Sequence, residues 1–390
     1  MTPAAPASPR TTRGLTIAGM ILVVVGMQVF IIQPGLIAIF VERMALSEDW
    51  AGYIASGEMA GIAAATIIVA LAGARVPWRT AVRAGTVLTC AANLASIWIS
   101  EPALFLVARS IAGFGCGFLI SIGYSVVGLS ANADRDFGRL ISLVLVYGAA
   151  GIFILPSANN AFGLGAIMFA LAVLTLVAIP ASLRLPAGEI AGRTEPVEQP
   201  VRYVAAVPRP VPVLVAAALF FLGQGFVWAF LALIGLSFGI AEQSVANGLM
   251  VAQLAGIAGA FCLAWLGGRV SQASFLICGS LASFLPLLAL LGGANAIAFG
   301  SAVTVFNFAA NLLTPLLMAM AASADTTGRT VQRAAAIQMI ALALGPAIAA
   351  PIAANFGFSL VLVIASALFA ATPVAGLYAR GKKAPGMAAV

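Results

Sequence analysis

The sequence predicts an all-helical membrane protein whose twelve transmembrane helices form two pseudo-symmetric six-helix bundles. Of its 390 residues, 62% are hydrophobic and only 8% are charged, whereas about a quarter are charged in an ordinary soluble domain. The mean hydropathy is +1.10. The hydrophobic residues form long continuous runs, unlike the short alternating segments of a membrane barrel. These observations exclude soluble, disordered and nucleic-acid-binding proteins.

The apolar runs give the expected spans in order. A helix needs about 20 apolar residues to cross a bilayer core of about 30 Å. Such runs lie at 15–40, 50–73, 81–99, 103–130, 139–160, 163–183, 211–238, 246–266, 272–292, 295–322, 331–354 and 356–379. Residues 184–210 are rich in charge and proline and predict a solvated linker. The expected organisation is a tail 1–14, a bundle 15–183, the linker, a bundle 211–379 and a tail 380–390.

The basic residues predict the orientation. With twelve spans, 17 of the 19 Lys and Arg residues fall on the side of the termini and the linker. Arg43 falls on the other side, and Arg109 lies inside a span. Cytoplasmic loops are enriched in Lys and Arg, so both termini are expected to be cytoplasmic. The expected location of the protein is the inner membrane of the cell. The net charge of +7 therefore reports topology, and no nucleic-acid partner is expected.

The two halves of the chain match each other in order. Met59-Ala-Gly-Ile-Ala-Ala-Ala65 resembles Leu254-Ala-Gly-Ile-Ala-Gly-Ala260, and Gly73-Ala-Arg-Val76 resembles Gly267-Gly-Arg-Val270. Further matches pair Gln28 with Gln224, Asp134 and Arg139 with Asp325 and Arg329, and Pro156 with Pro346. Each match pairs a span with the span six later. An internal repeat of this kind, with halves of like orientation, is one architecture of secondary transporters.

Two local motifs add a family resemblance. Arg109 is followed by Gly113, Gly115 and Gly117, similar to the Arg-and-glycine signature in the fourth span of the major facilitator superfamily. Gly73-Ala-Arg-Val-Pro-Trp-Arg79 stands where that family carries G-x-x-x-D-R-x-G-R-R, but without its acidic residue. The resemblance covers essentially the whole chain. It implies alternating access by two bundles, a central cavity lined by spans 1, 4, 7 and 10, and a monomer.

Glu58 and Arg109 are the charged residues placed well inside the predicted spans. A charge there costs a few kcal/mol and normally marks a function or a partner. Counted from the outer ends of their helices, Glu58 lies about 12 Å and Arg109 about 9 Å deep, so the two can pair. In one interpretation Glu58 takes up and releases a coupled proton, with Arg109 assisting the coupling or binding substrate. In the other, the pair only joins two helices.

Polar and aromatic side chains in the cavity-lining spans are the candidates for substrate binding. They are Gln28, Arg109, Tyr124, Gln224, Trp228, Asn307 and Asn311. Asn307 and Asn311 share one helical face with Thr304 and Thr314, and interhelical hydrogen bonding is the alternative role. Close packing or helix bending during gating is expected of Gly113, Gly117, Pro156 and Pro346.

Sequence motifs for catalysis or cofactor binding are missing. The chain has no His, and its four Cys lack metal-binding spacing. It also has no Walker loop, dinucleotide fingerprint or nucleophile elbow. Neither an enzyme, a cofactor nor a metal is expected.

The sequence therefore predicts a secondary transporter in the lipid bilayer. Its substrate is expected to be a small organic anion or polar-aromatic compound, and its transport is expected to be coupled to a proton. A proton-driven exporter of amphipathic compounds and transport without a coupled ion are alternatives. A non-transporting membrane receptor or a membrane enzyme is a remote one.

Overall fold

The computed structural model describes residues 13–72, 76–130, 132–186, 209–266, 269–324 and 329–379. Nearly all of the predicted tails and linker, the loop residues Gly73 to Arg75 and Asp325 lie outside these ranges. Within them, every regular element is a helix. The chain is an all-helical, multi-pass membrane protein.

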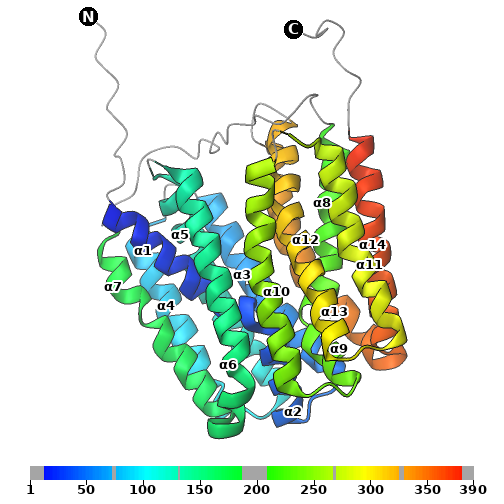
Figure 1. The fold of residues 1–390 in the computed structure, drawn as a ribbon. Helices are drawn as coiled ribbons and strands as arrows, with labels where there is room; N and C mark the ends of the chain where they lie inside the picture. The colour runs from blue at the N-terminus through cyan, green and yellow to red at the C-terminus, as the bar shows by residue number, and fades with distance from the viewer. Residues whose placement is uncertain are drawn as a thin grey trace, which may run out of the picture.

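The first half of the chain, defined here as α1 to α7, begins with an interrupted span (Figure 1). Its elements are α1 (Arg13–Gly26), the 3-10 helix η1 (Phe30–Ile32), α2 (Gln33–Met44), α3 (Glu48–Ala72), α4 (Trp78–Ala95), α5 (Pro102–Gly128), α6 (Ala133–Thr175) and α7 (Ala178–Leu183). The predicted span 15–40 is thus two helices, whose axes differ by 47°. Pro34 stands at the start of α2, a position where its missing N–H is not needed.

The second half, defined as α8 to α14, repeats this order. Its elements are α8 (Pro210–Trp228), α9 (Leu231–Ser237), α10 (Glu242–Leu266), α11 (Gln272–Ala289), the 3-10 helix η3 (Leu290–Gly292), α12 (Ala296–Ser323), α13 (Arg329–Phe356) and α14 (Phe358–Tyr378). The span predicted at 211–238 is also divided, into α8 and α9. Helix α1 begins and α14 ends at the same end of the bundle (Figure 1). We call it the basic end, because Arg13, Arg79, Arg139, Arg209 and Arg329 start helices there or lie close to those starts.

In the described part of the chain, nine helices are long and apolar enough to cross a membrane, or ten if α1 and α2 form one bent span. The predicted boundary between spans at 160–163 falls inside α6, where two helical segments are joined across a break at Gly163 (φ 75°, ψ 175°). The sequence predicts twelve spans. Dividing α6 at this glycine and counting the 18-residue α4, which carries Arg79 and Arg83 in its first two turns, would give that number.

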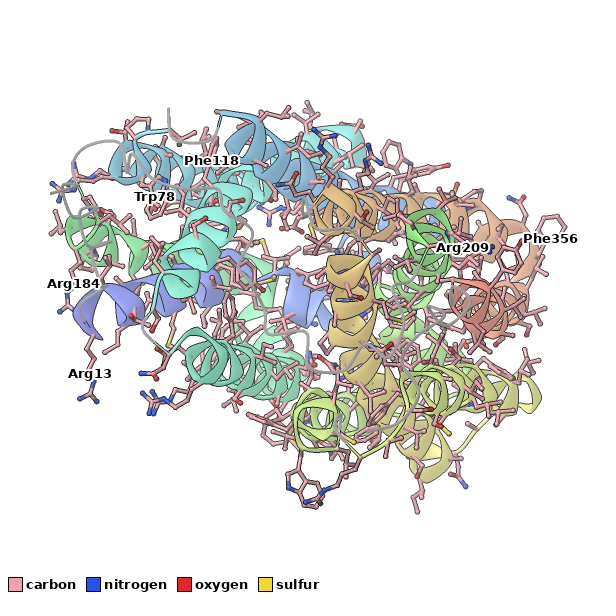
Figure 2. All side chains as sticks on the ribbon, turned by 90° about the horizontal axis from the view of Figure 1, so that it is seen from above. Arg13, Trp78, Phe118, Arg184, Arg209 and Phe356 are labelled. Atoms are coloured by element: carbon pink, nitrogen blue, oxygen red, sulfur yellow. The ribbon has the colours of Figure 1, made fainter. Side chains whose placement is uncertain are left out.

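Helix packing places the polar residues described below. In the first half, α5 lies against α1, α3 and α4. The two halves meet where α3 packs on α13 and α6 packs on α10, and in the view from above they occupy opposite sides of the molecule (Figure 2). Glycine makes the first of these contacts close, because a Cβ at Gly52 would lie 2.7 Å from the Pro346 carbonyl oxygen.

Candidate functional site

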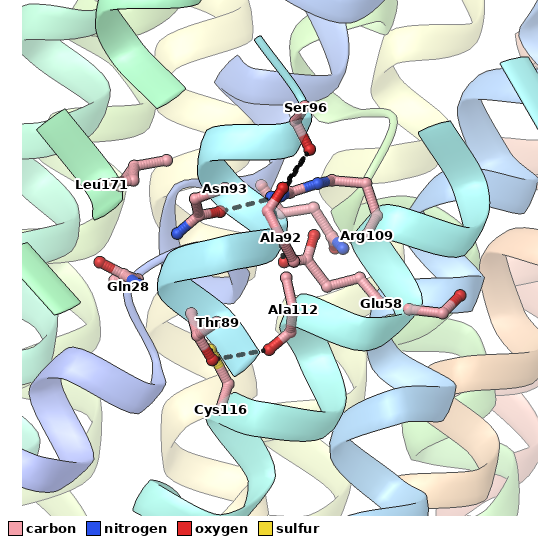
Figure 3. A network of polar contacts seen from close by, with 12 residues as sticks. Gln28, Glu58, Thr89, Ala92, Asn93, Ser96, Arg109, Ala112, Cys116 and Leu171 are labelled. Carbon is pink, nitrogen blue, oxygen red and sulfur yellow. Dashed lines mark hydrogen bonds and ion pairs between the residues drawn. The ribbon is translucent and has the colours of Figure 1, made fainter. Parts of the chain in front are cut away.

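Glu58 of α3 and Arg109 of α5 face each other in the core of the first half (Figure 3). Arg109 Nη1 lies 3.9 Å from Glu58 Oε1, and Arg109 is 0% and Glu58 2% exposed. A charge-assisted hydrogen bond would be about 2.7–2.9 Å long. The pair is therefore an electrostatic contact at longer range, without a direct hydrogen bond between these two atoms.

Helix α4 supplies the close partners of Arg109. Its Nη2 donates to Asn93 Oδ1 at 2.8 Å and to Ser96 Oγ at 2.9 Å. The guanidinium carbon also lies 5.7 Å from the centre of the Phe105 ring, within the range of a cation–π contact. Arg109 is thus held by α4 and by its own helix even without Glu58, and the carboxyl group is the loosest of its partners.

The helices approach closely around the pair because α5 is rich in glycine. A Cβ at Gly113 would overlap the backbone carbonyl of Glu58, and one at Gly117 would lie 2.6 Å from the Ile62 carbonyl oxygen. Both predicted packing glycines therefore set the distance between α5 and α3. In α4, one turn before Asn93, Thr89 Oγ1 donates to the Ala112 carbonyl of α5 at 3.0 Å.

Several polar atoms around the pair have no hydrogen-bond partner within the described residues. They are Glu58 Oε1, Arg109 Nε and Nη1, and Asn93 Nδ2; Ser56 Oγ and Gln28 Oε1, elsewhere in the first half, also have none. Buried polar groups are normally satisfied by protein or by internal water. This concentration in one helix bundle indicates a polar interior that can hydrate.

The interruption in the first span is a second polar cluster. Tyr147 Oη of α6 donates to the Gln28 carbonyl at 3.2 Å, Trp228 Nε1 of α8 to the Phe30 carbonyl at 3.0 Å, and Gln253 Nε2 of α10 to the Ile31 carbonyl at 2.9 Å. Non-helical backbone at membrane depth is tolerated where other groups satisfy it. Here the partners come from three different helices.

The amides of α12 extend this cluster. Asn307 Nδ2 donates to the Ala252 carbonyl at 2.7 Å and to Gln253 Oε1 at 3.2 Å, and Asn311 Nδ2 donates to the Asn307 carbonyl at 2.9 Å. Gly256 of α10 admits them, since a Cβ there would lie 2.7 Å from Asn311 Nδ2. The polar face of this helix, expected to line a cavity, is turned toward α10 in this arrangement.

The remaining predicted binding residues lie at different places. Gln28 is buried and its Nε2 donates to Thr175 Oγ1 at 2.8 Å, so its side chain joins the first span to α6. The Tyr124 ring is stacked on Phe137, with centroids 6.1 Å apart. Gln224 is half-buried on α8, one turn before Trp228. The structure thus brings Trp228, Asn307 and Asn311 toward one cluster and leaves Arg109 in another.

Two predicted prolines lie where the halves meet. Pro156 of α6 lines a cavity of about 30 Å³ together with Gly35 and Leu249, so residues of both halves border it. The carbonyl of Pro346 contacts Gly52, as described above.

The loop motif of the first half reaches a neighbouring helix end. Of its residues, Arg79 donates through Nη2 to the carbonyls of Leu183 and Leu185 at 3.1 and 2.6 Å. A cation at these carbonyls complements the C-terminus of α7.

Asn93 and Ser96 were missed by the sequence analysis. They are spaced three apart in an apolar segment, which places them on one helical face, and this spacing was the available signal. The bond from Gln253 to the first span was not predicted either.

Comparisons with known proteins agree with this fold. The model of the Major Facilitator Superfamily matches residues 18–330. A crystal structure of a mutant of the nucleoside transporter NupG is similar with a TM-score of 0.74 and 10% sequence identity, over 93% of this chain and 99% of that one. No match was found among curated proteins. Because the family model covers well over half of the sequence, the chain belongs to the major facilitator superfamily and is a membrane transporter.

Proposed function

We propose that the protein is a proton-coupled secondary transporter of a small organic solute, in which Glu58 takes up the proton and Arg109 is its charge partner. The observation that carries the proposal is the buried Glu58–Arg109 contact at 3.9 Å. A buried ionisable pair inside a membrane helix bundle costs free energy and is a functional site by default. Its loose geometry suits a group that changes charge during a cycle.

The neighbouring contacts suggest how protonation would act. With Glu58 ionised, attraction to Arg109 draws α3 toward α5. With Glu58 protonated, this attraction is lost, while Asn93 and Ser96 continue to hold Arg109. Helix α3 is also the helix that packs on α13 of the other half. A change in its position relative to α5 therefore reaches the surface that must slide or separate in alternating access.

The solute is proposed to be a neutral compound with a flat polar ring. Arg109 is 0% exposed and already held by α4, which leaves no free cation for an anionic solute in that cluster. The polar groups gathered at the first-span interruption are neutral hydroxyl, indole and amide groups. Nucleosides, the compounds for which NupG is named as a transporter, are polar ring compounds and the first class to test.

Transport in proteoliposomes tests the proposal. Uptake of radiolabelled uridine and adenosine would be measured with and without an inwardly directed proton gradient, beside counterflow exchange at equal pH. We expect Glu58→Gln to abolish the gradient-driven accumulation, because a neutral amide cannot carry the proton, and to retain counterflow. The matched control is Glu101→Gln, an exposed carboxylate at the start of α5.

The same assay separates the competing interpretations. Accumulation by Glu58→Gln equal to that of the unmodified protein would contradict proton coupling through this residue. If the protein took up benzoate and not nucleosides, and if Arg109→Ala lost this uptake, the neutral-solute proposal would be wrong. The result would instead support an organic anion as the substrate. Efflux of amphipathic cations would identify an exporter.

A further inference from the structure

Side-chain hydrogen bonds join the two halves at two levels of the described structure. At the end opposite the basic end, Ser157 Oγ donates to Gln243 Oε1 at 3.4 Å and Gln243 Nε2 donates to the Phe153 carbonyl at 3.2 Å. These involve exposed groups that water can replace. Deeper in the molecule lie the bonds from Trp228 to Phe30 and from Gln253 to Ile31.

The bonds at Phe30 and Ile31 differ from the first two in burial and in setting. Trp228 is 5% and Gln253 is 1% exposed, and both donate to consecutive carbonyls of one backbone interruption. The Phe30 and Trp228 rings also lie 6.4 Å apart. Water does not compete well for buried donors, so separating these groups leaves polar atoms without partners.

Close packing fixes the geometry of the second bond. A Cβ at Gly148 of α6 would lie 2.7 Å from the Ile31 side chain and 2.8 Å from Gln253 Nε2. Glycine at this position therefore lets α6, α10 and the interruption meet. The Oε1 atom of Gln253 accepts from Asn307, so the amide is oriented from its other side as well.

Each donor belongs to the second half, and each acceptor to the first. Both bonds lie where the first span of each half continues into α2 or α9, so a motion that separates α2 from α9 would strain or break them. We infer that these two bonds form a clamp that holds the end opposite the basic end closed, and that Trp228 and Gln253 are positioning residues that set the balance between closed and open forms. The inference rests on the proposed alternating-access cycle but on neither the coupled proton nor the solute.

Hydrogen–deuterium exchange of the full chain in nanodiscs, without solute and at equal pH, tests the clamp. Trp228→Phe keeps the ring and removes the donor, and Gln253→Leu removes the amide. Trp265→Phe and Gln332→Leu are the matched controls, since both residues are exposed. The segments to follow are 29–46 and 231–240, with α4 and α11 as internal references.

We expect each clamp variant to accelerate exchange in the two followed segments about threefold, the factor that corresponds to an average interhelical hydrogen bond of ~0.6 kcal/mol. The double variant should accelerate it about ninefold if the bonds act independently. The reference helices should be unchanged. A merely structural role would instead accelerate exchange in all helices, because it would lower global stability.

Two results would overturn the inference: exchange in the double variant equal to that of the controls, or acceleration spread evenly over the molecule. If one single variant does not fold, the other still tests its own bond. Failure of proton coupling in Glu58→Gln leaves this experiment unaffected, and failure here leaves the coupling assay unaffected, so the two proposals stand or fall separately.

Discussion

At the scale of single residues, the neighbours of Arg109 make different kinds of contact with it. Asn93 and Ser96 provide short hydrogen bonds, Phe105 provides a ring face, and Glu58 provides an opposite charge at longer range. The short hydrogen bonds and the opposite charge thus come from different neighbours of Arg109. A substitution at α4 and one at α3 should accordingly have different consequences.

Asn93→Ala should destabilise the protein without abolishing the proposed proton coupling. It leaves a buried guanidinium with one hydrogen-bonded partner fewer, and a bond to a charged group contributes about 1.5–3 kcal/mol. Thermal unfolding in detergent would show a lower midpoint than that of Ser142→Ala, whose hydroxyl bonds only to the Gly138 carbonyl of its own helix. Equal midpoints for the two variants would mean that Asn93 does not hold Arg109 in solution.

At the scale of elements, the breaks in the helices are the places where backbone groups and backbone conformation depart from a regular helix. Two long spans are divided, at residues 27–32 and at residues 229–230, and the two helical segments of α6 are joined across a break at Gly163. The first break exposes carbonyls that side chains satisfy, whereas Gly163 bends the chain through its own backbone. A Cβ at Gly163 would meet nothing within 4 Å, yet its φ of 75° is rarely adopted by other residues.

Gly163→Ala should therefore cost about 1–3 kcal/mol through backbone strain alone. Gly165→Ala is the matched control two residues away, where a Cβ would be in ordinary contact with Ile97 at 3.4 Å. Chemical denaturation of both variants in mixed micelles measures the difference. If the alanine at 163 were tolerated as well as the one at 165, the break would not depend on this backbone conformation.

The sequence predicted the helices well and their interruptions poorly. Apolar runs locate spans because the bilayer demands them, and depths counted along those spans were enough to place Glu58 and Arg109 at the same level. The break after Gly26 lies in a run, residues 21–32, that is almost entirely apolar, and Pro34 just after this run was the only signal used there. The partner of Gln28 was also beyond reach, because Thr175 is 147 positions away and a lone threonine in a span most often bonds its own helix.

At the scale of the whole molecule, the orientation in the membrane remains a prediction that thiol labelling can check. Ser47, between α2 and α3, and Thr80, in the first turn of α4, are both exposed and lie at opposite ends of the bundle. In a background without Cys90, Cys116, Cys262 and Cys278, we expect Ser47→Cys to react with an impermeant maleimide on intact cells. Thr80→Cys should react only after permeabilisation, because the positive-inside rule places the basic end in the cytoplasm.

Labelling of Thr80→Cys on intact cells would reverse the assigned orientation. Both variants should label in permeabilised cells, which controls for their reactivity. The result also shows on which side of the membrane the end that the clamp is proposed to hold closed lies, the end where α2 meets α9.

Amino-acid substitutions in the two halves would affect the clamp at the first-span interruption in different ways. Phe30 and Ile31 contribute main-chain oxygen atoms, and an amino-acid substitution at either position keeps that oxygen in the chain. Trp228 and Gln253 contribute side-chain donors, which a single substitution can delete or weaken. A single substitution can therefore delete a hydrogen-bonding atom of this contact only in α8 or α10, whereas in the first half it can act only through packing, for example at Gly148.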